Sequence, residues 1–200
     1  PAYTFIASAN AVLLNNAVPV FVDIDPETYN VDPDAVAKAI TSRTRAIMPV
    51  HFAGLPADLT RIRALAETHG ISVIEDAAQA HGAKWQGKGV GAQGNIGTFS
   101  FQGSKNLNAG EGGIILTNDD ALARAARSLV NCGRADDGLG YSHHRMAGNN
   151  RMSELQGALL LSQFERLESQ AQLRSENGRY LSDQLARIAG VSPNVVPGEG

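Results

Sequence analysis

Lys105 and Asp76 are the residues in this chain of 200 amino acids whose types and positions best suit chemistry. Lys105 follows an expected short strand, Thr98 to Phe101, and stands in a glycine-rich loop before an apolar run. A lysine held at a strand end with a lowered pKa can attack a carbonyl carbon and form a Schiff base. Taken alone, this segment favours a solvated surface lysine.

Asp76 comes directly after Ile71 to Glu75, which the sequence predicts to be a buried parallel strand. In open α/β sheets the ligand crevice lies outside the carboxyl ends of the strands. A carboxylate facing a pyridine nitrogen keeps that nitrogen protonated, and pyridoxal 5'-phosphate (PLP) needs such an Asp together with a lysine. Asp76 alone could equally be a helix cap or a turn residue. The presence of both residues, each at a strand end, favours the PLP interpretation.

Alternating strands and helices predict a parallel sheet with crossover helices. We expect strands at Val18–Ile24, Arg45–Val50, Ile71–Glu75, Thr98–Phe101 and Gly113–Leu116. We expect helices at Phe5–Leu14, Pro33–Ile40, Leu59 to about Gly70, Asp120 to about Asn131, from near Met152, and at Arg174–Ile188. Asp32 would cap the second of these helices, Gly70 would end the third, and Thr117 with Asp120 would form a capping box for the fourth. Arg134 to Asn150 reads as a mobile loop.

Composition limits the classes of protein that this chain can be. The apolar share of 43% and the charged share of 18% are typical of a soluble globular protein. A net charge of −3 gives no electrostatic case for nucleic-acid binding, and no stretch has transmembrane length or the character of a leader. The single cysteine, Cys132, rules out an internal disulfide and a multi-cysteine metal site, and fits a cytoplasmic setting. His143 and His144 are adjacent but make a weak metal case, so no metal is expected.

Five stretches, in order along the chain, resemble the DegT/DnrJ/StrS family of sugar aminotransferases, which are fold type I PLP enzymes. They are Pro1–Asn10, Pro19–Asp25, Pro49–Gly54, Glu75–Gly82 and the segment around Lys105. The resemblance implies a three-layer α/β/α fold with a mostly parallel sheet, the large domain of a PLP-dependent transferase. It also implies that residues 1–190 are most of this PLP-binding domain, without its N-terminal segment, and that 191–200 are a linker toward an absent small C-terminal domain.

The resemblance also assigns roles around the cofactor. Lys105 would hold PLP as an internal aldimine, and Asp76 would pair with the pyridine nitrogen. Gln79 would reach the phenolic oxygen, Ser100 would contact the phosphate, and Phe5 would stack on the ring. Without the resemblance, Gln79 could equally cap the next element, and Phe5 would be a core residue.

Asn149 matches the asparagine that reaches the phosphate from the neighbouring subunit, which implies a homodimer. The family usually reads Asn-Tyr-Arg-Met here, whereas this chain reads Asn149-Asn150-Arg151-Met152. Two histidines lie near these motifs. We expect His81 to make a structural hydrogen bond, and His51 could approach the substrate.

The activity implied is a ping-pong transfer of an amino group from glutamate, or glutamine, to a keto sugar that is usually nucleotide-linked. An inosose aminotransferase of the same family is an open alternative. Family dehydratases replace the lysine with histidine and some add an iron–sulfur cluster, which Lys105 and the single Cys132 disfavour. A regulatory family member or an inactive fragment is the non-enzymatic alternative.

Overall fold

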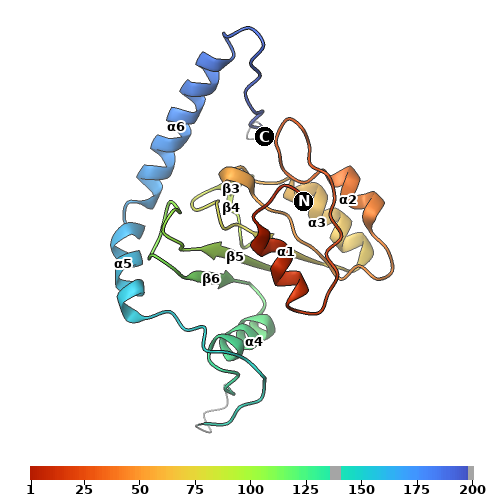
Figure 1. The fold of residues 1–200 in the computed structure, drawn as a ribbon, viewed down its shortest axis with the longest axis vertical. Coiled ribbons are helices and arrows are strands. Elements are labelled where there is room, and N and C mark those ends of the chain that lie inside the picture. Colours follow the sequence, from red (N-terminus) through yellow and green to blue (C-terminus); the bar gives the residue numbers. More distant parts are fainter. Residues whose placement is uncertain (136–140, 198–200) are drawn as a thin grey trace.

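The structure, a computed structural model, describes residues 1–135 and 141–197 (Figure 1). The helices are α1 (Ile6–Leu13), α2 (Pro33–Ala39), α3 (Leu59–His69), α4 (Asp120–Val130), α5 (Glu154–Phe164) and α6 (Leu167–Leu185), with a 3₁₀ turn, η1, at Phe52–Gly54. The strands are β1 (Ala46–Ile47), β2 (Ser72–Asp76), β3 (Lys84–Trp85), β4 (Lys88–Gly89), β5 (Ile96–Ser100) and β6 (Gly113–Leu116). The expected loop at Arg134 to Asn150 and the expected linker at 191–200 both include residues that lie outside the described ranges.

The main sheet has the strand order β1, β2, β5, β6 among the described residues. β2 runs parallel to β1 and to β5, whereas β6 is antiparallel to β5. The register places Asp76 opposite Thr98 on β5, and Ser100 opposite Gly113 on β6. The predicted α/β fold with a mostly parallel sheet is therefore confirmed.

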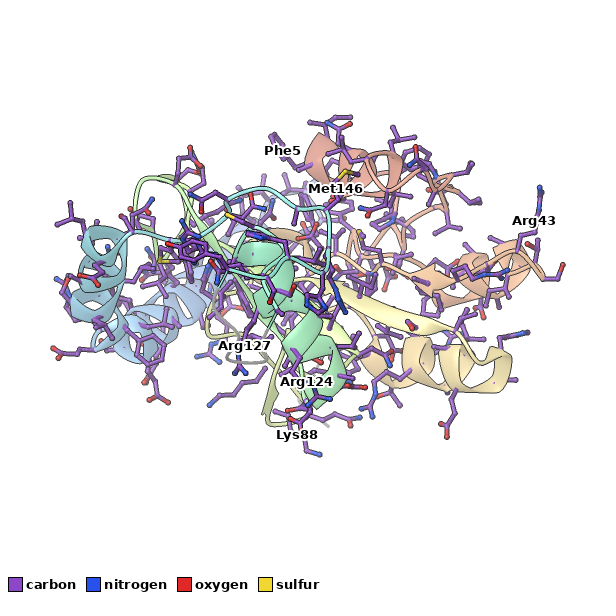
Figure 2. All side chains as sticks on the ribbon, turned by 90° about the horizontal axis from the view of Figure 1, so that it is seen from below. Phe5, Arg43, Lys88, Arg124, Arg127 and Met146 are labelled. Atoms are coloured by element: carbon purple, nitrogen blue, oxygen red, sulfur yellow. The ribbon has the colours of Figure 1, made fainter. Side chains whose placement is uncertain are left out.

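Helices cover both faces of this sheet. α1 lies on one side of β2 and α3 lies on the other, as the two views in Figures 1 and 2 agree. α3 is capped at its start by Asp58, whose side chain accepts from the backbone N–H of Arg61 at 3.0 Å. It is capped at its end by Gly70, which has the left-handed conformation. Its buried face joins α2 and the strands in one apolar cluster made of Val31, Val36, Ile47, Ala57, Ile62, Ala66 and Val73.

Two predictions about local structure were wrong. Val18–Ile24 forms no strand: only Ile24 makes a β-bridge, to Val31, and Val18 and Val20 are exposed. α4 is capped by Asp119 rather than by a Thr117–Asp120 capping box, because the Asp119 carboxylate accepts from the N–H groups of Ala121 and Leu122. The Thr117 hydroxyl is used elsewhere, since it donates to the carbonyl of Asn95 at 2.6 Å.

The helices after the sheet also differ from expectation. α5 begins behind a capping box formed by Ser153 and Gln156 that we did not predict, and α6 starts at Leu167 rather than at Arg174. α6 projects away from the sheet in Figure 1. Across the described residues, no helix combines the length and the apolar character that crossing a membrane requires.

Candidate functional site

The carboxyl ends of β2 and β5 bring the predicted site residues to one edge of the sheet. Asp76 is the last residue of β2 and Ser100 is the last residue of β5, which is the neighbouring parallel strand. The pairing continues one residue beyond Asp76, because the N–H of Ala77 donates to the carbonyl of Thr98 at 2.9 Å. Lys105 follows Ser100 in the connection to β6. The topology therefore places the carboxylate and the lysine loop at the same edge.

Lys105 stands in a loop that its backbone holds closed. The N–H of Gly103 donates to the carbonyl of Gly110, and that of Ala109 donates to the carbonyl of Phe101, both at 2.8 Å. Leu107 and Ala109 are buried against Phe101 in a small apolar cluster. Lys105 itself is half-buried. Its backbone is therefore fixed, while its amine makes no hydrogen bond or ion pair with another residue of 1–135 and 141–197.

Helix α5 holds this loop through a side chain, Gln163, that hydrogen-bonds to the main chain of the loop. This contact was not predicted from the sequence. The Gln163 amide accepts from the N–H of Asn108 at 3.3 Å and donates to its carbonyl at 2.6 Å. The Asn108 side chain in turn donates to the carbonyl of Lys105 at 3.1 Å. Gln163 lies 55 residues beyond Asn108 in the chain, so no local pattern signals this contact.

Helix α1 reaches the carboxylate of Asp76. The Ser8 hydroxyl donates to Oδ2 of Asp76 at 2.7 Å, and the N–H of Ala78 donates to Oδ1 at 3.2 Å. Backbone hydrogen bonds from Asp76 to Pro49 and from His51 to Asp76 fix the main chain at this point. This role of Ser8 was not predicted, since nothing local connects Ser8 with a residue 68 positions later.

Gln79 and Ser100 each keep hydrogen-bond donors for a further partner. Oε1 of Gln79 accepts from the N–H of Ala53 at 2.7 Å, so the amide NH₂ is its remaining polar group. Oγ of Ser100 accepts from the N–H of Gln102 at 3.2 Å, which leaves the hydroxyl proton for another acceptor. Oε1 of Gln79 therefore does not cap the element that follows it, because it accepts from the earlier η1 turn, while the amide NH₂ can still donate to another partner.

Phe5 and Asn149 lie differently from the other predicted residues. Phe5 is the N-cap of α1 and is 70% exposed, so it is not the core residue that it would otherwise be; Figure 2 shows it at the outside of the molecule. Asn149 is exposed and forms a β-bridge with Asn131 at the end of α4. No described contact joins Asn149 to the Lys105 loop of the same chain.

The side chain of His51 is buried inside the protein, so the prediction that it could approach a substrate was wrong. Its side chain is fully buried, with Nδ1 accepting from the N–H of Ala57 at 3.1 Å and Nε2 lying 3.0 Å from Oε2 of Glu75. Since Nδ1 is an acceptor, Nε2 carries the proton and donates to Glu75. His51 therefore anchors the loop that contains η1.

Glu75 is a buried carboxylate that the sequence analysis treated only as a strand residue. Besides His51, it accepts from the N–H groups of Gly91, Gln93 and Gly94 at 2.6, 2.7 and 2.5 Å. Burial alone would raise the pKa of Glu75, but these hydrogen bonds outweigh it and hold the pKa below the ordinary value. Glu75 thus ties the loop before β5 to β2.

His81 is buried between the two strand ends, as the structural role predicted for it requires. Nε2 donates to the carbonyl of Ser100 at 2.8 Å, whereas the buried Nδ1 has no hydrogen-bond partner among the described residues. Burial lowers the pKa of His81, the bond to Ser100 opposes this, and the positive charge of Lys105 lowers it further.

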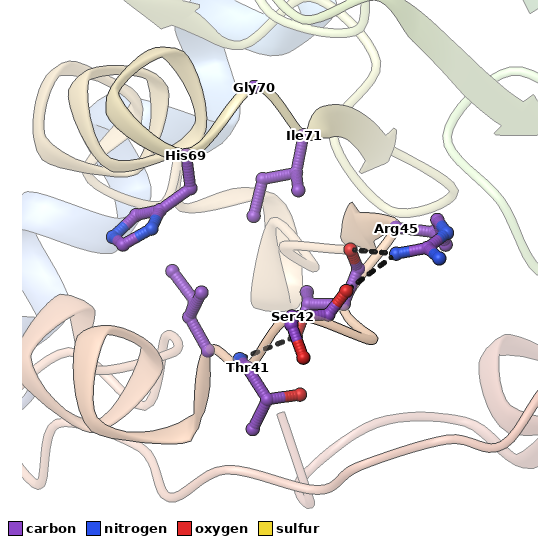
Figure 3. A pocket seen from close by; sticks show the side chains of 8 residues that line it. Thr41, Ser42, Arg45, His69, Gly70 and Ile71 are labelled. Atoms are coloured by element: carbon purple, nitrogen blue, oxygen red, sulfur yellow. Dashed lines mark hydrogen bonds between the residues drawn. The ribbon is translucent and has the colours of Figure 1, made fainter.

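A separate hollow of about 570 Å³ lies at the opposite end of the strands (Figure 3). It is lined by Ile40, Thr41, Ser42, Thr44, Arg45, His69, Gly70 and Ile71. Arg45 there donates to the carbonyls of Ser42 and Thr44, and most of the lining side chains are exposed. Because it adjoins the amino ends of β1 and β2, this hollow is remote from Asp76.

Known proteins resemble this chain in sequence and in fold. Residues 1–199 match the model of the DegT/DnrJ/EryC1/StrS aminotransferase family. A protein of Streptoalloteichus tenebrarius, named putative L-glutamine:3-amino-2,3-dideoxy-scyllo-inosose aminotransferase, is 45% identical over 192 residues, which are 96% of this chain and 46% of that protein. The UDP-N-acetyl-3-dehydro-alpha-D-glucosamine 3-aminotransferase of Acidithiobacillus ferrooxidans is 45% identical over 189 residues, 94% of this chain and 50% of that protein.

A solved structure extends the likeness to three dimensions. The crystal structure of 3-amino-5-hydroxybenzoic acid synthase superposes with a TM-score of 0.94 at 42% identity, over 100% of this chain and 53% of that one. The chain therefore spans about half the length of the proteins that it matches. By family model, sequence identity and fold, this chain belongs to the DegT/DnrJ/EryC1/StrS aminotransferase family.

Proposed function

We propose that the protein containing this chain is a PLP-dependent aminotransferase that acts on a keto sugar. The observation that carries the proposal is the position of Asp76 and Lys105 at the carboxyl edge of two adjacent parallel strands, where α/β sheets bind ligands. An intact lysine and carboxylate at this edge also favour an enzyme over the alternatives of a regulator or an inactive fragment.

The chemistry of the donor set supports PLP as the cofactor. A phosphate needs hydrogen-bond donors, and the Ser100 hydroxyl has a proton to give. A phenolic oxygen needs a donor, which the Gln79 amide supplies once Oε1 is fixed on Ala53. A pyridine nitrogen needs a carboxylate, and Asp76 stands at the end of β2. The free Lys105 amine can hold an aldehyde.

When bound, the cofactor would supply an electron sink for the carbon that loses or gains the amino group. Lys105 would hold it covalently and would carry a proton at its amine between donor and acceptor atoms. Asp76 would keep a proton on the ring nitrogen. Phe5 would cover the ring, and Asn149 would reach the phosphate from a second copy of the chain.

Two substrate classes remain within this proposal. The names of the relatives indicate a nucleotide-linked keto sugar in one case and an amino-scyllo-inosose in the other. We favour a keto sugar as the acceptor and glutamate or glutamine as the amino donor, with an inosose as the alternative acceptor. The biosynthesis of amino sugars for cell-surface polysaccharides would use such a reaction.

The organisation of the whole protein is part of the same proposal. Residues 1–190 would be most of the PLP-binding large domain, and 191–200 would lead to a small C-terminal domain. The protein would work as a homodimer, since Asn149 is exposed and makes no described contact with the Lys105 loop of its own chain, as a role toward a second copy requires. Its single cysteine fits a cytoplasmic location.

The test is a visible absorbance spectrum of the full-length protein with PLP, recorded before and after addition of glutamate or glutamine. We expect a band from the lysine linkage that the amino donor removes, and no such band in Lys105→Ala. Lys88→Ala is the matched control, because Lys88 is exposed on the β3–β4 hairpin (Figure 2). A panel of UDP-linked keto sugars and inososes then identifies the acceptor. Turnover by Lys105→Ala above background refutes the assignment.

A further inference from the structure

Two hydroxyl groups in series end on the carboxylate of Asp76. Oγ of Ser8 donates to Oδ2 of Asp76 at 2.7 Å, and Oγ1 of Thr4 lies 2.7 Å from Oγ of Ser8. A serine hydroxyl has one proton, and Ser8 uses it on Asp76. Thr4 must therefore be the donor to Ser8, which polarises the Ser8 hydroxyl and strengthens its bond to the carboxylate.

The start of α1 sets this geometry. Phe5 is the N-cap of α1, so Thr4 lies just before the helix and Ser8 is its third residue, and the chain entry brings the two hydroxyl groups to 2.7 Å. Ala9, next to Ser8, is the residue of α1 that is buried, whereas Phe5 and Ile6 are exposed. The side chain of Ser8 therefore faces the sheet, whereas that of Phe5 faces away from the protein interior.

The Asp76 carboxylate is restrained through both oxygens. Ser8 holds Oδ2, and the N–H of Ala78 holds Oδ1. The main chain of Asp76 is fixed by hydrogen bonds of 2.9 Å to the carbonyl of Pro49 and 3.0 Å from the N–H of His51. With the main chain fixed, the side-chain torsions of Asp76 decide where the carboxylate points, and Ser8 supplies the shorter of the two restraints on them.

We propose that Ser8, supported by Thr4, is a positioning residue that orients the Asp76 carboxylate toward the ring nitrogen of the cofactor. The inference rests on the proposed function. Ser8 could instead serve only to tether α1 to β2, and the two roles differ in one respect. A positioning role matters only when the ligand has a ring nitrogen, whereas a tether matters for every ligand.

The experiment compares PLP with its 1-deaza analogue, in which a C–H group replaces the ring nitrogen while the aldehyde and phosphate remain. Dissociation constants of both compounds are measured by spectroscopic titration of the full-length apoprotein, for wild type, Ser8→Ala and Ser8→Thr. We expect Ser8→Ala to weaken PLP about tenfold, because a carboxylate without this restraint must be ordered when the cofactor binds. Binding of the analogue should change less than about twofold.

Ser8→Thr keeps the hydroxyl and should bind PLP as wild type does, so the loss in Ser8→Ala follows the hydrogen bond and not the side chain's size. Asp76→Asn should abolish the preference of wild type for PLP over the analogue. Equal weakening of both compounds by Ser8→Ala, or no weakening of PLP, overturns the positioning role.

The failure of the underlying function would look different. A wild-type protein that binds neither compound refutes the proposed function, and the inference falls with it. A wild type that binds both compounds equally well shows that Asp76 does not face the ring nitrogen, which also overturns the inference. Tight binding of the analogue by Ser8→Ala demonstrates that the variant is folded.

Discussion

Nε2 of His81 donates a hydrogen bond of 2.8 Å to the carbonyl oxygen of Ser100, and this contact joins the segment after β2 to the end of β5. Nδ1 of the same ring is buried without a partner in the described part of the chain. A neutral ring satisfies this arrangement, because a proton on Nδ1 would bring a buried positive charge close to Lys105.

The first prediction concerns pH. Since burial lowers the pKa of His81 below 6.5, the unfolded chain takes up this proton first as the pH falls. The stability that His81 contributes is thus complete above pH 6.5 and is lost as the pH falls through the lower folded pKa. Denaturant unfolding of wild type and His81→Gln between pH 8 and pH 5 should show a steeper loss in wild type. Equal slopes would contradict this, since the two proteins differ only at position 81.

The second prediction is that Glu75→Gln destabilises the fold by about 3 kcal/mol, because an amide nitrogen would face backbone N–H donors that the carboxylate now satisfies. Glu67→Gln is the matched control, since Glu67 is exposed on α3. The free energy of unfolding at pH 7 provides the measurement. A loss no greater than that of the control would show that the Glu75 network adds nothing to stability.

Acid should act through the same carboxylate. The folded pKa of Glu75 lies below its ordinary value of 4.5, so its contribution to stability is present above pH 4.5 and is lost as the pH falls through the folded pKa. We expect the wild-type free energy of unfolding to decline more steeply than that of Glu75→Gln in this range. Parallel declines would rule out Glu75 as a source of acid sensitivity.

The fourth prediction is that Gly97→Ala destabilises the protein by about 3 kcal/mol, because overpacking a close contact displaces backbone. A Cβ at position 97, in β5, would overlap the carbonyl oxygen of Gly91. Gly157→Ala in α5 is the control, since a Cβ there meets nothing within 4 Å and alanine favours helix. Thermal unfolding of both variants gives the comparison, and a neutral Gly97→Ala would contradict the close approach.

The fifth prediction tests whether Asn149 acts across a subunit boundary. Lys105→Ala and Asn149→Ala should each be nearly inactive alone. When the two variants are refolded together, a mixed dimer contains one site with an intact Lys105 and an intact Asn149 from the other copy. Activity should therefore return to a substantial part of that of wild type. No recovery in a confirmed mixed dimer would place Asn149 at the site of its own chain.

Local patterns predicted much of the fold. Asp32 caps α2 and Gly70 ends α3, as expected, because both effects depend on residues within one turn of the helix. Where two local signals competed, the prediction failed: Asp119 caps α4 because the hydroxyl of Thr117 is used by Asn95, which lies 22 residues earlier. Val18–Ile24 has the composition of a strand, but strand structure also requires a partner, and only Ile24 has one.

The sequence by itself determined the α/β class and the candidate chemistry, because Asp76 and Lys105 each follow a segment, Ile71–Glu75 and Thr98–Phe101, whose local character predicts a strand. Tertiary structure decided what surrounds them. The burial of His51 beside Glu75, the clamp of Gln163 on Asn108, and the hydrogen bond from Ser8 to Asp76 join residues 24, 55 and 68 positions apart. Such contacts depend on how helices and strands pack in space, and packing leaves no signature in the spacing of neighbouring residues.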